Sequence, residues 1–449
     1  MAGTLSIESR YVKIKAVKEI RVRIAPSPTG LAHVGNIYIA LFDFAFARKN
    51  KGKFVLRVDD TDMKRHVPEA EKVIYDAFKW LGLEHDEGPD VGGPFGPYRQ
   101  SERLNYYQQY VKKLVKDGLA YEKEGAIWFK VPEGQTSWDD LIRGRIEFNN
   151  KEINDFVILK SDKYPSYNFA TTIDDWLMKI SHVTRAEEHI SNTPRQIMLY
   201  QGLGAEIPQF AHFPLLRNAD HSKISKRKNP VALSWYQEQG YLPEALINFL
   251  CLLGWSHPEG KDVFPIEEFI KNFSFERISK SAPIFDLKKL DWLNGVYLRQ
   301  KSDEELFKLL KPFAFKGADD DLIKKTIPLV KERLVKLSDY PQMVNFFIEE
   351  PKVDLKLLLE KGGKDKSIIK NQFEIILDEL EKVGWKAANL ENLFRKIAQE
   401  KNYHIGKFFM AVRIALTGKS GTPPLFETME VLGKEKTLKR LKKVINDFK

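Results

Sequence analysis

The sequence has one cysteine, Cys251, in 449 residues, and this scarcity excludes a disulfide framework. It also excludes a zinc site built from several cysteines, and the nine histidines are too scattered for a cage made of histidine. No apolar run approaches the roughly 20 residues that a transmembrane helix needs. Residues 1–20 include Glu8 and Glu19 and have no apolar core, which disfavours a targeting signal. We therefore expect a soluble, reduced, cytoplasmic protein.

The composition is that of a globular protein, with 43% hydrophobic and 30% charged residues. At ordinary domain sizes the length suggests about three domains. The net charge of +10 is uneven, because residues 301–449 carry 30 basic and 23 acidic side chains. This excess of +7 predicts either a polyanionic partner for the last third of the chain or a lysine-rich solvated helical surface.

The segment from residue 20 to residue 81 alternates between strand and helix patterns. Residues 20–24 alternate like a strand, residues 37–48 form a mostly buried helix pattern, and residues 53–58 form a second strand pattern. Another helix pattern begins near Pro68. This order predicts the beginning of a parallel α/β sheet.

The rest of the chain changes character twice. After residues 86–99, which are rich in Gly and Pro, the segment 103–166 combines a short helix with strand-like pieces and indicates a small insertion of mixed structure. The α/β pattern resumes near Tyr167. Beyond about residue 235 the sequence becomes helical, and from about residue 300 nearly every stretch fits helical periodicity.

A first chemical motif, residues 26–36, lies between the first strand and its helix. At this place backbone N–H groups and the helix dipole favour an anion. His33 is suited to donate a hydrogen bond to a phosphate oxygen, and Gly35 allows a nucleotide to approach the backbone closely. The alternative is a turn braced by prolines that contains an incidental histidine.

A second motif is the cationic run Lys223–Lys228, which contains four basic residues and a serine. Such a run suits a loop that clamps nucleotide phosphates, although a basic run seen alone is more often a solvated face. The pair of motifs is more specific than either one. Both are expected at the carboxyl edge of one sheet, where nucleotides bind.

These motifs and their surroundings resemble a known family. His33-Val34-Gly35-Asn36 resembles the first signature of class I aminoacyl-tRNA synthetases, and Lys223–Arg227 resembles the second. The segments that resemble bacterial-type glutamyl-tRNA synthetases are Arg23–Gly30, Arg57–Asp62, Tyr98–Arg103, Tyr164–Phe169, Val183–His189, Ser191–Arg195, Phe285–Asp286 and Leu290–Gly295. The resemblance runs from about residue 21 to the carboxyl terminus and is densest up to residue 300.

The resemblance implies an α/β fold with a Rossmann-type parallel-sheet catalytic domain, a small inserted acceptor-binding domain and an all-helical C-terminal anticodon-binding region. The implied parts are an N-terminal extension at 1–20, a first catalytic half at 21–102, the insertion at 103–166, a second catalytic half at 167–218, a stem-contact region with the cationic motif at 219–302, and the helical region at 303–449.

The resemblance also implies a glutamate–tRNA ligase. The α-carboxylate of L-glutamate attacks ATP to give glutamyl-adenylate and pyrophosphate, and the terminal adenosine of tRNA(Glu) then takes the glutamyl group with release of AMP. Because no protein nucleophile is needed, catalysis depends on positioning and on stabilisation of charge at phosphorus. The catalytic residues implied are His33, Lys223, Lys226 and Arg227. Mg²⁺ is expected with ATP, held mainly by the phosphates and by no protein site of its own.

The substrate-binding positions follow from the same resemblance. Arginine suits the second carboxylate of glutamate because its fork binds both oxygens. The glutamate-binding positions are Arg23, Ala25, Ser27, Asp59, Tyr167 and Arg185, and the ATP-binding positions are Gly35, Asn36, Glu188, Leu216 and Lys226. Taken alone, Arg185 is also compatible with a surface salt bridge to Glu187 or Glu188.

Three features depart from the family. The family usually has glutamate, in contact with the substrate's ammonium group, where this chain has Asp59, so either the backbone lies closer or a water bridges the gap. The insertion is shorter than usual, with a loss expected between Glu122 and Trp128, where some relatives bind zinc. With one cysteine in the chain, we expect no zinc. Residues 1–19 precede the start of the resemblance.

The helical tail is expected to contact tRNA through Arg333 and Arg413, although Arg333 also fits a solvated helix face. We predict an enzyme that discriminates tRNA(Glu) from tRNA(Gln), with a non-discriminating ligase as the alternative. A glutaminyl-tRNA synthetase usually has a β-barrel anticodon region, and an inactive tRNA-binding paralogue commonly loses the phosphate-binding residues. The expected partners are tRNA(Glu), L-glutamate and ATP, without DNA or a membrane, and the expected state is a monomer.

Overall fold

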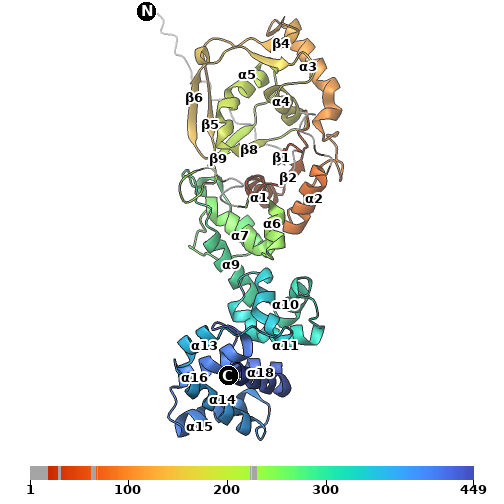
Figure 1. The fold of residues 1–449 in the computed structure, drawn as a ribbon. Coiled ribbons are helices and arrows are strands. Elements are labelled where there is room, and N and C mark those ends of the chain that lie inside the picture. The colour runs from red at the N-terminus through yellow and green to blue at the C-terminus, as the bar shows by residue number, and fades with distance from the viewer. Residues whose placement is uncertain are drawn as a thin grey trace, which may run out of the picture. The chain divides into compact units, whose positions relative to one another are not determined.

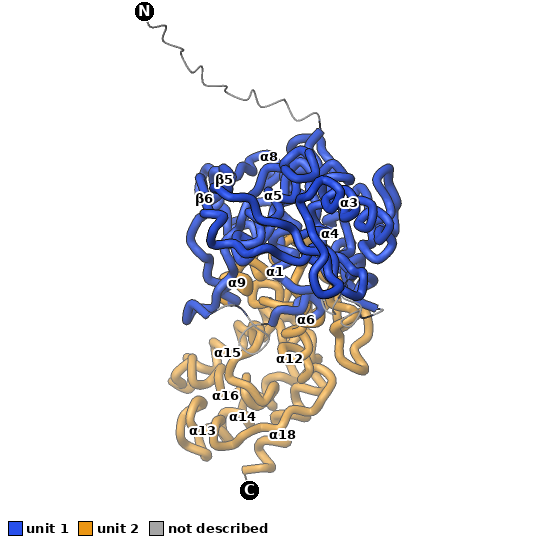
Figure 2. Tube along the Cα trace, turned by 90° about the horizontal axis from the view of Figure 1, so that it is seen from above, with its two compact units in different colours: residues 1–236, 246–287 blue, residues 237–245, 288–449 orange. Residues whose placement is uncertain are grey.

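The computed structural model describes residues 19–28, 32–61, 67, 69–222, 224 and 230–448. The chain divides into two compact units (Figure 2). Unit 1 consists of residues 1–236 and 246–287, and unit 2 consists of residues 237–245 and 288–449. This division is coarser than the six parts expected from the sequence, whose individual boundaries stay predictions.

Unit 1 is built on two pairs of parallel strands, which Figure 1 shows beside helix α1. Strand β1 (Arg21–Ile24) pairs with β2 (Lys53–Leu56), and β8 (His182–Ala186) pairs with β9 (Gln209–Phe213). The Ser181 N–H donates to the Arg21 carbonyl over 2.9 Å and joins the two pairs. The parallel sheet predicted from the sequence is therefore confirmed.

Helix α1 (Val34–Lys49) connects β1 to β2 and is buried on nearly every side. Its apolar residues make this possible, since Leu41, Phe42 and Ala45 are all fully buried. Helix α8 (Ile266–Asn272) packs on it, with the ring centroids of Phe42 and Phe269 at 5.6 Å. The helix predicted over residues 37–48 thus begins earlier, directly after a histidine cap. The other helices beside the sheet are α2 (Ala70–Leu81), α4 (Tyr167–Leu177) and α5 (Thr193–Leu203).

The predicted insertion contains one helix, a small antiparallel sheet and a hairpin. These elements are α3 (Leu104–Lys116), the sheet of β3 (Ala120–Lys123), β4 (Ala126–Phe129) and β7 (Phe156–Leu159), and the hairpin of β5 (Gln135–Asp140) and β6 (Gly144–Asn149). Its buried residues Leu114, Phe129 and Ile158 share one core with Phe169 of α4. The end of the hairpin lies beside β9, where the Leu141 N–H donates to the Phe210 carbonyl over 2.9 Å.

Helices α6 (Leu233–Glu238) and α7 (Pro243–Gly254) each contain residues of both units. The rest of unit 2 is helical, as predicted, and comprises α9 (Leu287–Gln300), α10 (Asp303–Leu310), α11 (Asp320–Val330), α12 (Tyr340–Val344), α13 (Leu355–Gly362), α14 (Lys366–Leu380), α15 (Ala387–Glu400), α16 (Ile405–Thr417), α17 (Leu425–Leu432) and α18 (Lys434–Asp447). Side chains cap these helices, since Ser302 and Glu305 form a capping box at α10 and Asp319 caps α11. Among the described helices, none has the length and apolar character required to cross a membrane.

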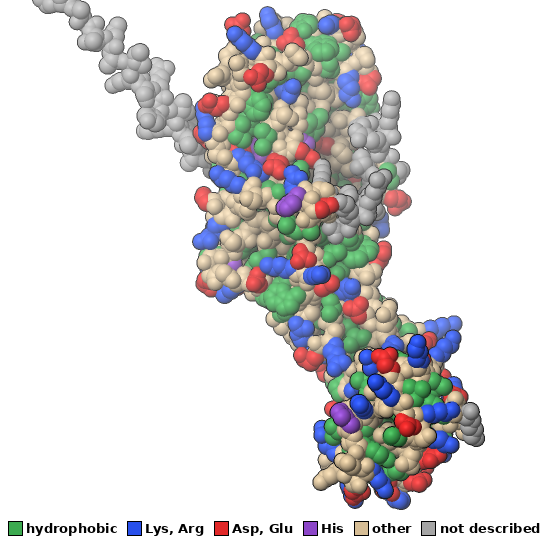
Figure 3. All heavy atoms as spheres, turned by 60° about the vertical axis from the view of Figure 1, so that its left-hand side comes forward, with side chains coloured by type: hydrophobic (Ala, Val, Ile, Leu, Met, Phe, Trp, Pro, Cys, Tyr) green, Lys and Arg blue, Asp and Glu red, His purple; other side chains and the backbone are tan. Residues whose placement is uncertain are grey.

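The basic side chains on the surface of unit 2 are scattered among acidic ones. Figure 3 shows one face of the molecule, on which Lys and Arg side chains of the helical unit are interspersed with acidic ones. Unit 2 has exposed ion pairs between side chains one helical turn apart, such as Lys325 with Asp321 at 2.6 Å. Exposed pairs of this kind contribute little stability, and they leave the net positive charge of the region unchanged.

Candidate functional site

A cleft of about 510 Å³ opens in unit 1 at the carboxyl ends of β1 and β8 and at the first turn of α1. In open α/β sheets ligands bind at this edge. The cleft brings together eleven residues that the sequence marked as site residues: Arg23, Ala25, Ser27, His33, Gly35, Asn36, Asp59, Tyr167, Arg185, Glu188 and Leu216. The catalytic candidates Lys223, Lys226 and Arg227 lie outside the described residues.

His33 is the N-cap of α1. Its backbone is extended, with φ −88° and ψ 133°, and its Nδ1 accepts a hydrogen bond from the Gly35 N–H over 3.0 Å. Because Nδ1 is the acceptor, the ring proton of the neutral imidazole resides on Nε2. A Cβ at Gly35 would lie 3.1 Å from Nδ1, so a larger residue there would crowd the cap. The first turn of α1 therefore presents a ring N–H donor and a helix N-terminus, both of which suit an anion.

Arg23, at the end of β1, is buried and paired with a carboxylate. Its Nε and Nη2 donate to the two oxygens of Asp175 over 2.9 and 3.2 Å, and its Nη1 donates to the Thr184 carbonyl over 3.2 Å. Burial opposes the charge, but Asp175 outweighs it and raises the pKa of the guanidinium above its usual value. Arg23 is thus charged, and Asp175 balances this charge.

Arg185, at the end of the neighbouring strand β8, has different partners. Its Nε donates to His212 Nε2 over 3.1 Å and its Nη2 donates to the Thr193 hydroxyl over 2.8 Å. Its Nη1 is buried and has no hydrogen-bond partner among the described residues. The side chain is 6% exposed, so the alternative of a surface salt bridge was wrong. Glu187 pairs instead with Arg143 at 2.6 Å.

Asp59 lies at the end of β2, and its carboxylate is paired with Arg57. The Arg57 Nε donates to Asp59 Oδ1 over 2.7 Å, and its Nη1 donates to Asp175 over 2.6 Å. Burial raises the pKa of Asp59 to about 6, although Arg57 opposes this shift. Arg57 therefore links the carboxylate beside the cleft to the carboxylate that balances Arg23.

Tyr167 begins α4 and is 42% exposed at the mouth of the cleft. Its hydroxyl lies 3.4 Å from Nδ1 of His189, which also lines the cleft. Burial, followed by the charge of Arg185, lowers the pKa of His189 to about 4. The imidazole of His189 is therefore neutral at physiological pH.

The cleft also has an apolar part. Pro214, Leu215 and Leu216 line it together with Ile224 and Val231. Ile224 lies within the cationic run and Val231 lies three residues after it, and both are buried. An apolar wall next to a helix N-terminus matches the two halves of a nucleotide, a flat base and a phosphate chain.

Arg333 and Arg413 belong to unit 2 and converge on one turn. Both donate through Nη1 to the Thr422 carbonyl, and Arg413 also donates to the Pro423 carbonyl over 2.7 Å. Burial, with the charge of Arg333, lowers the pKa of Arg413 from its usual value. The two guanidinium groups share a carbonyl acceptor that carries no charge. Neither positive charge is neutralised there, and together they make this turn positively charged.

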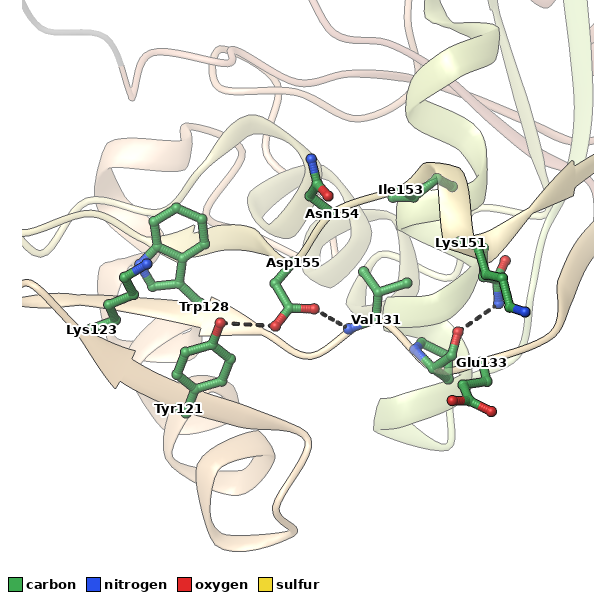
Figure 4. Close-up of a pocket in the computed structure, with 11 residues that line it drawn as sticks. Tyr121, Lys123, Trp128, Val131, Glu133, Lys151, Ile153, Asn154 and Asp155 are labelled. Carbon is green, nitrogen blue, oxygen red and sulfur yellow. Dashed lines mark hydrogen bonds between the residues drawn. The ribbon is translucent and has the colours of Figure 1, made fainter.

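The part of the insertion where the sequence predicts a loss forms a tight hairpin. Strands β3 and β4 are joined by Glu124 and Gly125, whose φ angles of 53° and 74° match a two-residue turn. Beside it lies a second pocket of about 480 Å³, shown in Figure 4. There the Tyr121 hydroxyl donates to Asp155 over 2.8 Å, and the Lys123 ammonium lies 5.5 Å from the centre of the Trp128 ring.

A group of side chains that could hold a metal ion lies elsewhere in unit 1 and consists of His257, Glu259 and Glu268. Lys261 already pairs with both carboxylates, at 2.9 Å from Glu259 and 2.7 Å from Glu268. The Glu259 N–H donates to His257 Nδ1 over 3.1 Å, so this ring nitrogen already has a hydrogen-bond partner within the protein. The lysine supplies the positive charge that this group requires.

Sequence reasoning missed several residues that support the cleft, namely Arg57, Asp140, Asp175, His189 and His212. Arg57 carried a weak signal, because it precedes Asp59 by two positions and such neighbours in extended chain share a face. His212 carried none, since a single histidine in an apolar strand is more often a core residue. Its partner Asp140 lies 72 residues away in the sequence.

Comparisons with known proteins agree with this geometry. A family model described as "tRNA synthetases class I (E and Q), catalytic domain" matches residues 19–126 and 122–292, and one described as "Anticodon binding domain" matches residues 305–445. The glutamate–tRNA ligase of Thermus thermophilus is 42% identical in an alignment of 466 positions that covers 94% of this chain and 99% of that protein. The one of Symbiobacterium thermophilum is 39% identical over 483 residues, with 94% and 99% covered. A crystal structure of a glutamate tRNA ligase from Elizabethkingia meningosepticum in complex with its amino acid aligns with a TM-score of 0.87 at 31% identity, covering 96% of this chain and 100% of that one.

Proposed function

Because this chain belongs to the family of class I tRNA synthetases (E and Q), we propose that it is a glutamate–tRNA ligase that joins L-glutamate to tRNA(Glu) at the expense of ATP. In the first step an oxygen of the α-carboxylate attacks the α-phosphorus, and the bond to the bridging oxygen breaks to release pyrophosphate. In the second step a ribose hydroxyl of the terminal adenosine attacks the acyl carbon and AMP leaves. Neither step needs a protein nucleophile.

Two buried arginines, Arg23 and Arg185, lie at neighbouring strand ends, and this pair is the observation that supports glutamate as the substrate. A carboxylate satisfies the buried Nη1 of Arg185, whereas the amide of glutamine supplies no charge to balance the guanidinium. Tyr167 and Ser27 lie beside this position, and Asp59 faces the ammonium group. Its shorter side chain is held by Arg57.

ATP occupies the other half of the cleft. Its phosphates lie at the N-terminus of α1 with His33, Gly35 and Asn36, and its base lies along the apolar wall that contains Leu216. Glu188 lines this part too. Lys223, Lys226 and Arg227 stabilise the charge that develops on phosphorus, a role supported by the position of their neighbours Ile224 and Val231 at the cleft.

Mg²⁺ fits this arrangement as a companion of ATP. The cleft offers the carboxylates of Asp59 and Glu188, and Asp59 is already paired with Arg57. The ion is therefore held mainly by the phosphates, where it neutralises their charge. No step requires a metal site made by the protein alone.

Unit 2 binds the anticodon arm of tRNA(Glu). The anticodon-binding family model at residues 305–445 and the excess of +7 in residues 301–449 support this role. Arg333 and Arg413, whose charges add, contact the tRNA. The enzyme discriminates tRNA(Glu) from tRNA(Gln), acts in the cytoplasm as a monomer and binds neither DNA nor a membrane.

Aminoacylation with labelled glutamate or glutamine, each offered tRNA(Glu) and tRNA(Gln), tests the proposal. We expect ATP-dependent charging of tRNA(Glu) with glutamate alone. If the enzyme charges tRNA with glutamine, then glutamine and not glutamate is its substrate. If it charges neither tRNA, the chain is an inactive relative. Equal glutamylation of both tRNAs would contradict discrimination and leave the ligase activity intact.

A further inference from the structure

Arg185 is held in the cleft by neutral acceptors. Its Nε donates to His212 Nε2 and its Nη2 to Thr193, whose hydroxyl also lies 3.1 Å from that same His212 nitrogen. Arg23, by contrast, is held by the Asp175 carboxylate at 2.9 Å. A neutral acceptor orients a guanidinium without balancing its charge, so the charge of Arg185 remains available to a ligand.

Burial lowers the pKa of His212 and keeps its ring neutral, although Asp140 opposes this shift, and Asp140 determines which ring nitrogen carries the proton. The Nδ1 of His212 lies 2.5 Å from Asp140 Oδ2, and both side chains have 0% exposure. Burial by itself raises the pKa of Asp140. Hydrogen bonds from His212 and from backbone N–H groups outweigh burial and hold this pKa below its usual value. An ionised carboxylate only accepts hydrogen bonds, so the ring proton resides on Nδ1 and the lone pair of Nε2 faces Arg185.

The backbone determines which oxygen of Asp140 faces the histidine. Oδ1 accepts N–H groups of Ile142, Arg143 and His212 over 3.1, 3.0 and 3.2 Å. Oδ2 accepts from the ring of His212 and, over 3.4 Å, from the indole N–H of Trp138. The orientation of Asp140 is thus set by backbone N–H groups of the turn between β5 and β6 and of strand β9.

We propose that Asp140 and His212 are positioning residues for Arg185, which hold its guanidinium by a neutral acceptor and thereby present its uncompensated charge and Nη1 to the side-chain carboxylate of glutamate. This inference rests on the proposed function and deepens it. It identifies the means by which a buried arginine retains the charge that distinguishes a carboxylate from an amide.

The decisive variant is Asp140→Asn. The three backbone N–H groups retain the amide oxygen at the Oδ1 position, so the amide NH₂ takes the place of Oδ2 and donates to His212 Nδ1. The ring proton then moves to Nε2 and opposes the N–H of Arg185. We expect the KM for glutamate to rise about 10- to 100-fold, as for a buried hydrogen bond that is broken, while the KM for ATP stays within about twofold.

Two comparisons separate positioning from general damage. Asp139→Asn makes the same change of charge at the adjacent position, where the side chain is 82% exposed, and should leave both KM values unchanged. His212→Gln retains an acceptor for Arg185 and should raise the KM for glutamate less than His212→Leu, which has none. Because the glutamine side chain has no tautomer to set, Asp140→Asn should add little further effect in the His212→Gln background.

The parental enzyme must first charge tRNA(Glu) with glutamate, and failure there would count against the proposed function and not against these residues. A selective, non-additive rise in the KM for glutamate supports the proposal. An unchanged KM, an equal rise for ATP, or additive effects of the two substitutions would overturn it. Asp140→Asn could lower the melting temperature so far that its kinetics cannot be measured. The test is then the KM for glutamate of the two His212 variants. A smaller rise in His212→Gln than in His212→Leu supports the proposal, and equal rises overturn it.

Discussion

The arginines of the cleft and those of the helical unit are held in opposite ways. Arg23 and Arg185 are buried and held mainly by side chains of other helices and strands. Arg333 and Arg413 instead donate to the backbone carbonyl of Thr422 in a turn. Side-chain partners fix the direction of both guanidinium groups in the cleft and balance the charge of Arg23 alone, which suits one small substrate. Backbone partners set position alone and leave the charge to add, which suits a polyanion.

The largest effect is expected from Arg185→Gln. Loss of a buried charge that faces a carboxylate costs about 2–5 kcal/mol, so kcat/KM for glutamate should fall on the order of 30- to 5000-fold with little change in the KM for ATP. Arg145→Gln, at a side chain that is 53% exposed, is the matched control and should act like the parental enzyme. A change of less than about threefold at Arg185 would mean that the cleft does not select charge through this residue.

The next effect concerns His33, which caps α1 through Nδ1 and, in the proposed function, donates from Nε2 to the nucleotide. Both His33→Ala and His33→Asn remove the Nε2 donor and should lower kcat about 100-fold. Asparagine still caps the Gly35 N–H, so only His33→Ala should also lose about 1 kcal/mol of unfolding free energy. Rates and denaturant unfolding of both variants test this separation, and retained activity in His33→Asn would refute the role of Nε2.

A smaller effect is expected from pH through Asp59, whose pKa is raised to about 6 by burial. Above this pH the carboxylate is ionised and attracts the ammonium group of glutamate. As the pH falls through about 6 the carboxyl is protonated, and the KM for glutamate should rise about tenfold for each further unit. The measurement is the KM for glutamate between pH 8 and pH 5, and Asp59→Asn should flatten the profile at a high KM.

The smallest effect is expected in unit 2. Arg333→Gln should weaken tRNA(Glu) binding about 3- to 10-fold and reduce the slope of log affinity against log salt by about one, with kcat at saturating tRNA unchanged. Arg413→Gln should in addition lower the melting temperature, because Arg413 donates three hydrogen bonds to Thr422 and Pro423. An unchanged salt slope in both variants would separate this pair from tRNA binding.

Much of the fold and of the candidate site could be predicted because its signals are local in the sequence. The alternation of residues 20–24 and the apolar residues 37–48 predicted β1 and α1, and the strand-then-turn order placed the motif at residues 26–36 between them. The same order placed Arg23 and Asp59 at strand ends. The structure brings these residues to one cleft, as parallel strands require.

The partners of these residues could not be predicted, because the contacts join segments far apart in the chain. Arg57 reaches Asp175 across 118 positions, and His212 reaches Asp140 across 72. Neither pair has a spacing that distinguishes it from the many other charged pairs of the sequence. The cap at His33 was also missed, so α1 begins earlier than its apolar pattern alone indicated.

The sequence by itself determined the family, the parallel sheet with its helical tail, and the residue types available to bind a nucleotide and a dicarboxylic amino acid. Only the tertiary structure decided which charges are balanced and which remain free. Arg23 and Arg185 are equivalent as letters in the sequence, yet one is paired with a carboxylate and the other with a neutral imidazole. The reason is physical, because the state of a buried charge depends on distance, burial and the position of single protons, and these quantities exist only after the chain has folded.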